Sequence, residues 1–412
     1  MLEILSDPEK WLAFFRQKTE GGHLYKTEED DLRRFIENGE YRAVAADFQA
    51  GAPLPYPRAA IICKHHTGKK RTVFLFPREV NYALKLLAWG LRRYDGVFSP
   101  RLFSFRRGTD VHQAIRSLLQ VRGLGDMYAY KADIHDYFNS VDVEKLLPML
   151  RQILKDDAPL YGFLAGMLRC PYALQDGQPV RMRKGIMAGM PLSAFLANVY
   201  LMPLDSAMEA SGLVYARYSD DIIIFAPEEA ALEDGIRRIH AILKERGLEI
   251  NPDKEARIRP REPWTFLGFT CSGGKVDVAE ASVRKLKAKM RRKTRALMRW
   301  RIRNNKDGGK AARAFIRRFN QKLYGSPRRG ELTWARWYFP LLNTDRSLRA
   351  LDHYMQDCIR YLATGTRGKQ RFSLRYETMK QWGYRPLVHA YYTGLAGPSA
   401  EEPPPPPADG SA

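Results

Sequence analysis

Cysteine is scarce in this chain, whose 412 residues include only four of them. Cys63, Cys170, Cys271 and Cys358 are far apart in the sequence, so neither a disulfide scaffold nor a zinc site built from paired cysteines is expected. No apolar run is long enough to cross a membrane, and no signal peptide is visible. We therefore expect a cytoplasmic protein without a membrane partner.

Acidic residues are scarce after residue 280. Residues 281–412 contain 29 Lys/Arg and 9 Asp/Glu, whereas residues 1–280 contain 39 and 37. The formal charge of +22 therefore arises almost entirely after residue 280, and it predicts a polyanionic partner. Residues 284–303 include 11 basic residues and no acid, interleaved with apolar ones, which predicts a basic amphipathic helix. A solvated helix face or a helix on a membrane surface is the alternative.

Two neighbouring carboxylates lie in the segment Tyr218-Ser219-Asp220-Asp221. Apolar, β-branched runs on either side predict a hairpin of two strands, over 213–217 and 222–226, with the acids at its turn. Adjacent carboxylates repel each other, so a bound cation is the usual reason to keep both at a rigid tip. A solvated Ser-Asp-Asp turn is the simpler alternative.

A third carboxylate, Asp133, ends a strand predicted over 127–132, and Asp142 can cap a helix predicted over 143–154. Together with the pair at the hairpin, Asp133 would complete a set of oxygen ligands suited to one or two Mg²⁺ ions. Between these segments, Gly185 and Gly189 lie in a loop that leads into an apolar helix, with Ser193 as a plausible cap. Glycines allow a backbone to approach a ligand closely, but a plain loop before a core helix is an equal alternative.

The order of these segments resembles the palm of reverse transcriptases: a strand ending in an acid, a glycine loop with a helix, a Tyr-x-Asp-Asp hairpin, then Trp264-Thr-Phe-Leu-Gly-Phe269. The resemblance extends from about residue 58 to 395. It implies an α+β, right-hand polymerase fold, with fingers and an RRM-like antiparallel palm sheet in residues 58–278. A mainly α-helical, basic thumb would follow in residues 279–395. Residues 1–57 are expected to form a helical extension, and the proline-rich residues 396–412 a disordered tail.

The resemblance implies roles for individual residues. Asp133, Asp220 and Asp221 would be catalytic and coordinate two Mg²⁺ ions, with the backbone carbonyl of Ile134 as a further ligand. Phe138 would lie under the sugar of the incoming nucleotide and exclude a 2′-hydroxyl, so that dNTPs are preferred. Packing of Phe138 in the palm core is the alternative.

Other segments are similar to the nucleotide and nucleic-acid contacts of the family. Lys70 and Arg71 would reach the triphosphate, and Ala188 and Gly189 would lie beside the nucleotide. The primer grip would consist of Leu267, Gly268 and Phe269. The thumb cations expected to hold the RNA/DNA duplex are Arg284, Lys285, Lys287, Arg291, Arg292, Lys293 and Arg295. For the aromatic residues between 334 and 339, core packing is expected rather than base stacking.

Departures from the family's usual motifs bear on the subgroup. Ala188 stands where many reverse transcriptases carry Gln, and Ala194 after Ser193 argues against both intron maturases and diversity-generating retroelements. The Val-Thr-Gly typical of retron thumbs does not occur in the sequence. The chain resembles most the "unknown group" of defence-associated bacterial reverse transcriptases, which implies antiphage defence and a cognate non-coding RNA as a partner. The alternatives are a retron- or group II intron-related enzyme and, more distantly, a non-catalytic RNA-binding protein.

Overall fold

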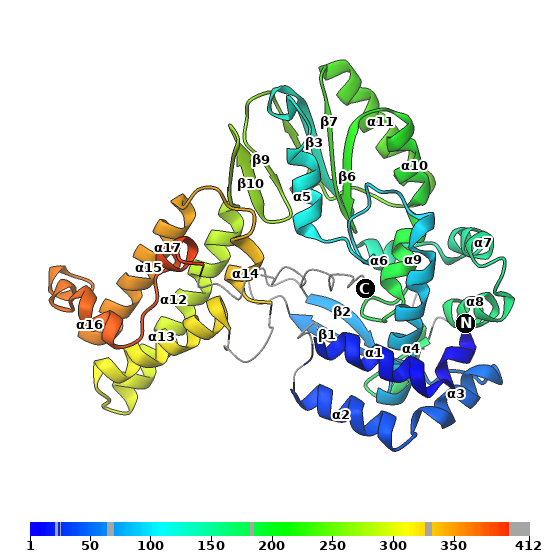
Figure 1. The fold of residues 1–412 in the computed structure, drawn as a ribbon, viewed down its shortest axis with the longest axis horizontal. Helices are drawn as coiled ribbons and strands as arrows, with labels where there is room; N and C mark the ends of the chain where they lie inside the picture. The colour runs from blue at the N-terminus through cyan, green and yellow to red at the C-terminus, as the bar shows by residue number, and fades with distance from the viewer. Residues whose placement is uncertain are drawn as a thin grey trace, which may run out of the picture. The chain divides into compact units, whose positions relative to one another are not determined.

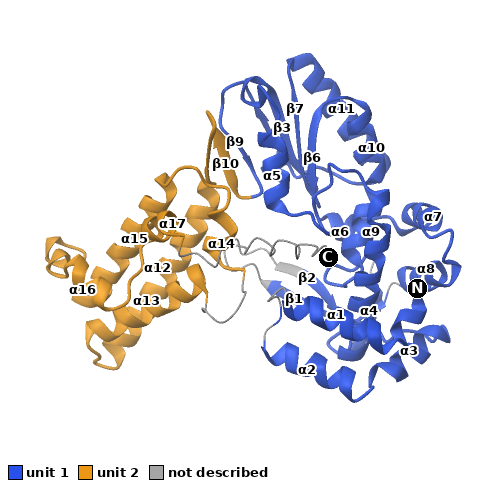
Figure 2. Ribbon diagram, viewed as in Figure 1, with its two compact units in different colours: residues 1–267 blue, residues 268–412 orange. Residues whose placement is uncertain are grey.

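The computed structural model describes residues 1–20, 24, 26–63, 70–170, 172–181, 185–325 and 332–394, without the side chains of Cys63, Lys70 and Arg71. The chain forms two compact units, residues 1–267 and residues 268–412 (Figure 2). The expected tail, residues 396–412, lies outside the described residues.

The first unit combines helices with two four-stranded sheets (Figure 1). Its helices are α1 (Pro8–Glu20), α2 (Lys26–Glu37), α3 (Tyr41–Gln49), α4 (Arg78–Gly90), α5 (Val111–Leu119), α6 (Tyr137–Ser140), α7 (Val143–Ile153), α8 (Ala158–Arg169), α9 (Ser193–Tyr200), α10 (Met202–Ala210) and α11 (Glu229–Glu245). Its strands are β1 (Arg58–Cys63), β2 (Lys70–Leu75), β3 (Tyr128–Asp133), β4 (Tyr172–Gln175), β5 (Gln178–Arg181), β6 (Val214–Tyr218), β7 (Asp221–Ala226), β8 (Ala256–Ile258) and β9 (Trp264–Phe266).

Buried aromatic side chains join the N-terminal helices. The Asp7 carboxylate accepts hydrogen bonds from the backbone N–H groups of Glu9 and Lys10, which caps α1. Trp11 of α1 is buried, and the centre of its ring lies 5.4 Å from that of the Phe35 ring and 5.6 Å from that of the Tyr41 ring. These aromatic contacts join α1, α2 and α3 into one packed layer, and α1 and α3 also contact α4.

The antiparallel sheet with strand order β6-β7-β3-β8 positions the predicted acids. Its central strand β7 is buried on both faces, because residues 222–226 are all apolar and inaccessible. Helix α11 packs against β3 and β7, and α5 packs against β6. The second sheet, with order β2-β1-β4-β5, contains the expected fingers strand β2, which pairs antiparallel with β1. The mixed α+β organisation expected from the sequence is confirmed.

The second unit is mainly helical. It contains the hairpin β10 (Phe269–Ser272) and β11 (Lys275–Val278), followed by α12 (Glu280–Arg303), α13 (Gly308–Tyr324), α14 (Trp334–Tyr338), α15 (Arg346–Thr364), α16 (Tyr376–Gln381) and α17 (Leu387–Tyr392). Helices α12, α13 and α15 pack against one another around apolar side chains such as Met290, Phe315 and Met355. Gly383, at a φ of 90°, and Pro386 separate the short helices α16 and α17.

Within the described ranges, no helix combines the length and the apolar character needed to cross a bilayer.

Candidate active site

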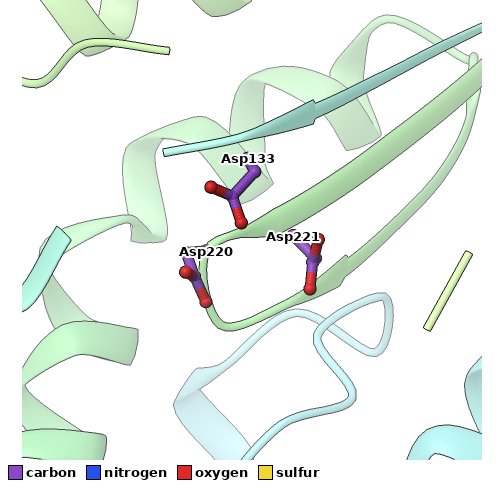
Figure 3. Close-up of side chains that lie close together, drawn as sticks. All are labelled: Asp133, Asp220 and Asp221. Atoms are coloured by element: carbon purple, nitrogen blue, oxygen red, sulfur yellow. The ribbon is translucent and has the colours of Figure 1, made fainter. Parts of the chain in front are cut away.

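Three predicted acids meet at one edge of the first unit's antiparallel sheet (Figure 3). Asp133 ends β3 and pairs in register with Asp221, the first residue of β7, while Asp220 lies in the turn between β6 and β7. Each side chain offers one carboxylate oxygen, and these oxygens all lie within 4.8 Å of one another. The Ile134 N–H donates to the carbonyl of Asp220 at 3.1 Å, which ties the end of β3 to the turn.

Burial and mutual repulsion make the ionised form of the clustered acids less favourable. Burial, followed by repulsion from Asp220, raises the pKa of Asp221 to about 6. Burial and the charge of Asp133 likewise raise the pKa of Asp220. Such shifts arise when desolvated like charges lie close together, and a hard divalent cation bound by carboxylate oxygens relieves them. The donor set therefore fits Mg²⁺ or a similar ion.

The sequence did not reveal two further residues that contact Asp133. Lys254 Nζ lies 2.5 Å from Asp133 Oδ2, and Asn251 Nδ2 lies 3.4 Å from Asp133 Oδ1. The Asn251 backbone N–H also donates to the Asp133 carbonyl at 2.7 Å. The ammonium of Lys254 offsets part of the cluster's charge. Asn251 and Lys254 lie more than a hundred positions beyond Asp133, so no local pattern in the sequence connects them with it.

A buried ion pair supports the hairpin that carries Asp220 and Asp221. Arg217 on β6 is 0% exposed, and Asp205 on α10 is 1% exposed. The guanidinium makes two hydrogen bonds to the carboxylate, at 2.7 Å from Nε and 2.5 Å from Nη2, and Tyr215 donates a third at 2.7 Å. Arg217 Nη1 also donates to the carbonyl of Ser219 at 3.1 Å. The pair therefore holds the residue that immediately precedes the two acids.

Ser219 itself adopts a left-handed conformation, with a φ of 60°. Its N–H donates to Ser104 Oγ at 2.8 Å, and Asn198 Nδ2 donates to the Ser104 carbonyl at 3.0 Å. A non-glycine residue in this region is held there by its surroundings, at a cost of about 1–2 kcal/mol. The turn is thus fixed from both sides, through Arg217 and through Ser104.

The glycine loop packs against the segment that contains Phe138. A Cβ on Gly185, where φ is 97°, would lie 2.6 Å from both Asn139 Cα and the Phe138 carbonyl oxygen. The Ile186 N–H donates to that same carbonyl at 2.9 Å. Only glycine fits such a close approach between two backbones. The Phe138 ring is half-buried and lies 5.6 Å from that of Tyr137, so its role as a sugar gate stays a prediction.

The other end of the loop lies against β2. The Phe74 N–H donates to the Ala188 carbonyl at 2.9 Å, and a Cβ on Gly189 would lie 3.1 Å from Val73 Cβ. The loop therefore joins the expected fingers strand to the Phe138 segment. Lys70 and Arg71 belong to the same strand, paired with β1, although their side chains lie outside the described residues.

Ser193 does not act as a helix cap. It is the first residue of α9, and its hydroxyl donates to the carbonyls of Ile186 and Met187 at 2.6 and 2.8 Å. The side chain thus closes the loop onto the helix start. A serine before an apolar helix suggested a cap. Here the hydroxyl instead donates to loop carbonyls that point at it.

The predicted primer-grip residues differ in how accessible they are. Leu267 and Gly268 have φ values of 49° and 91°, which forms a turn between β9 and β10. Phe269 is 0% exposed, and its ring lies 5.2 Å from that of Tyr338. Phe269 is therefore a core residue of the second unit. A contact with a primer would come from the backbone of the turn.

The predicted thumb cations all lie on α12. Arg284 forms an ion pair with Glu280 at 2.8 Å, and the Lys287 ammonium lies 5.6 Å from the centre of the Tyr354 ring. The apolar residues between the cations, such as Leu286, are buried, as expected for an amphipathic helix.

Comparison with known proteins identifies the family of this chain. Residues 62–271, just over half of the chain, match the model of the reverse transcriptase (RNA-dependent DNA polymerase) family. The chain belongs to the reverse transcriptase family. The matched range of this reverse transcriptase contains all three acids and the glycine loop, and its fold class is the right-hand polymerase fold expected from the sequence.

The retron Ec86 reverse transcriptase of Escherichia coli is 24% identical over 226 residues, which cover 54% of this chain and 65% of that protein. Among solved structures, the telomerases of Candida tropicalis and Candida albicans are similar at 15% and 13% identity, with TM-scores of 0.43 and 0.44. They cover 54% and 82% of this chain, and 55% and 65% of the telomerase chains. The chain thus spans less than two thirds of the length of each of these relatives.

Proposed function

We propose that this protein is an RNA-directed DNA polymerase that extends a primer with dNTPs along an RNA template. The observation that carries the proposal is the cluster of Asp133, Asp220 and Asp221, whose carboxylate oxygens lie within 4.8 Å of one another. Phosphoryl transfer requires little covalent chemistry from a protein beyond positioning and neutralisation of charge. A cluster of buried and half-buried acids, in which burial raises the pKa values of Asp220 and Asp221, suits that task.

Two Mg²⁺ ions are the proposed cofactors, held by the three carboxylates and the carbonyl of Ile134. When bound, such ions activate the primer 3′-hydroxyl and stabilise the charge on the leaving pyrophosphate. Arg217 and Ser104 hold the hairpin so that Asp220 and Asp221 face Asp133.

The remaining site residues would orient the nucleotide. The proposed nucleotide site consists of Phe138, the loop at Ala188 and Gly189, and β2 with Lys70 and Arg71. Support comes from the hydrogen bonds and close contacts by which the loop joins β2 to the Phe138 segment. The Phe138 ring would select dNTPs by excluding a 2′-hydroxyl, and the cations of β2 would bind the triphosphate.

The template and the biological role are also proposed. A dedicated non-coding RNA is the template that we propose, in the cytoplasm, with a role in antiphage defence as an "unknown group" enzyme. The retron relative favours a second candidate, a retron-related enzyme, although the Val-Thr-Gly typical of retron thumbs is missing from the sequence. Sequencing the RNA and DNA that copurify with the protein separates the two, because a retron product is a DNA joined to its own RNA.

Primer extension tests the polymerase proposal. A DNA primer annealed to an RNA template should be extended by the wild type, and extension should be lost in Asp220→Asn/Asp221→Asn. The matched control is Asp234→Asn, which removes an exposed acid of α11 that is paired with Arg238. RNA binding without extension by the wild type would instead support the non-catalytic alternative, and extension by the double variant would refute the assigned site.

A further inference from the structure

Two charged grooves flank α12 within the second unit. The first groove lies toward α13 and α14, and its lining includes Lys285, Lys289, Lys322, Trp334 and Trp337. The second lies toward α15 and the segment after it, and its lining includes Arg291, Arg295, Tyr354, Tyr361, Arg367 and Arg371. The buried face of α12 separates the two grooves.

The lysine groove continues the turn at Gly268. Ser282 and Tyr338 line this groove, and a Cβ on Gly268 would lie 3.2 Å from the Tyr338 hydroxyl. Burial and the charges of Lys322 and Lys285 lower the pKa of Lys289, so the groove is crowded with positive charge. Because it adjoins the predicted primer grip, this groove would be the surface for the template–primer duplex.

The arginine groove faces a different direction. Arg291 lies six positions after Lys285, and Arg295 six positions after Lys289, which corresponds to about 120° around an α-helix. The arginine groove encloses about 290 Å³, close to the lower end of the range for small-ligand sites. Its position and size suit a single nucleotide outside the duplex.

Positive charge in the arginine groove exceeds the available negative charge. Asp357 is the one acid in its lining, and it is already paired with Arg371, Nε to Oδ1, at 3.3 Å. Among the described residues, Arg291, Arg295 and Arg367 have no carboxylate within 4.0 Å. Three guanidiniums without an acid partner, facing one pocket, favour binding of an anion, and guanidinium geometry suits phosphate.

Aromatic rings complete the groove. The Arg367 guanidinium lies 4.9 Å from the centre of the Tyr361 ring. Burial raises the pKa of Tyr354, and the nearby guanidiniums of Arg291, Arg367 and Arg295 oppose that rise. The rings and the guanidiniums are therefore close neighbours. Unpaired RNA bases are recognised by stacking on such aromatic and guanidinium planes while cations hold the phosphate.

We infer that this arginine groove binds an unpaired nucleotide of an RNA, with its phosphate on Arg295 and Arg367 and its base against Tyr361. The inference rests on the proposed function for the choice of RNA as the ligand. It assigns Arg291 and Arg295 to an RNA segment outside the template–primer duplex, rather than to the duplex as the sequence predicted. The groove would thereby help the enzyme to recognise its own RNA.

Fluorescence titrations test the inference with the full chain. The variant Arg295→Gln/Arg367→Gln removes two guanidiniums that lack an acid partner. Its matched control, Arg238→Gln/Arg349→Gln, removes two exposed arginines that are paired with Asp234 and Asp345. The probes are a 20-nucleotide single-stranded RNA, a DNA of the same sequence and a blunt RNA/DNA duplex.

The groove variant should bind the single-stranded RNA at least about tenfold more weakly than the control. The negative slope of log K against log salt should become shallower by about 1.4, because two phosphate contacts are lost. Its affinity for the duplex should stay within about twofold of the control. Tyr361→Leu should weaken RNA binding about tenfold without changing the slope, because it removes stacking and leaves the charge. Melting temperatures of all variants separate these effects from misfolding.

Equal losses for duplex and single strand would overturn the inference, as would a loss no larger than that of the control. Equal binding of the single-stranded DNA would overturn the assignment to RNA. Primer extension on a pre-annealed template distinguishes this failure from failure of the proposed function. If the wild type extends the primer and the groove variant binds RNA normally, only the inference about the groove is refuted. A wild type without polymerase activity would refute the proposed function.

Discussion

Replacing Arg217 with methionine should both destabilise the protein and weaken metal binding at the acid cluster. The side chain has no solvent contact, makes two hydrogen bonds to Asp205 and donates a third to the Ser219 carbonyl. Methionine fills similar space without a donor. The Asp205 carboxylate would then stay buried without its cation, and the Ser219 carbonyl would lose the donor that fixes the turn.

The magnitude follows from the burial of the pair. Removing one partner of a buried ion pair costs about 3–5 kcal/mol, most of it because the other charge stays desolvated. Arg217→Met/Asp205→Leu removes both charges and should return the free energy of unfolding to within about 2 kcal/mol of the wild type. Part of that residual loss is the Tyr215 hydroxyl, which loses its acceptor at a cost of about 1 kcal/mol. The donor to Ser219 is still missing in the double variant.

The assay measures stability and metal affinity separately. Urea unfolding in EDTA gives the stability, and titration with Mn²⁺ followed by electron paramagnetic resonance gives the affinity. Loss of groups that orient metal ligands costs about 10–100-fold in affinity, so both variants should show such a loss although only the single variant is strongly destabilised. Arg169→Met, which breaks the exposed pair with Glu144, should leave both the stability and Mn²⁺ binding essentially unchanged. A double variant that regains wild-type Mn²⁺ affinity would refute the positioning role of Arg217.

Three further predictions concern stability and substrate choice. In EDTA, Asp221→Asn should stabilise the protein by about 3 kcal/mol above pH 6. The pKa of Asp221 in the folded state, about 6, exceeds the usual value of 3.8, so the wild type loses stability as the pH rises between these two values. The gain should vanish toward pH 4, and a gain independent of pH in urea titrations would contradict this cause. Gly185→Ala should cost about 2–4 kcal/mol in the same assay, since its Cβ would meet the Asn139 backbone at 2.6 Å. Gly177→Ala, at a φ of 82° but in open space, should cost only about 1 kcal/mol, and equal costs for the two would contradict the steric argument. Phe138→Ala should lower the ratio of kcat/KM for dNTPs to that for rNTPs at least about tenfold, measured by single-nucleotide incorporation, whereas an unchanged ratio would leave Phe138 as a packing residue.

Local patterns in the sequence predicted the elements that carry the acids. Alternating and β-branched residues indicated the strands on either side of the Ser219-Asp220 turn, and the structure has them as β6 and β7. Asp142 caps α7 as expected, since its carboxylate accepts from the Glu144 N–H at 3.0 Å. Such features depend on neighbours within a few residues, which the sequence displays directly.

Contacts between distant residues were not predictable from the same patterns. Nothing in the strand pattern indicated that Arg217 is buried, because its burial depends on Asp205, which a helix supplies. Lys254 reaches Asp133 because β8 brings the preceding turn next to β3. The conformational freedom of Gly185 could be predicted from its residue type, but the Phe138 carbonyl that packs against it could not.

Single-turnover incorporation of one dNTP into a DNA primer on an RNA template tests the central claim most directly. The account predicts incorporation that rises with Mg²⁺, stops in EDTA and falls at least about a thousandfold in Asp133→Asn. Incorporation that persists in EDTA, or that Asp133→Asn leaves unchanged, would contradict it.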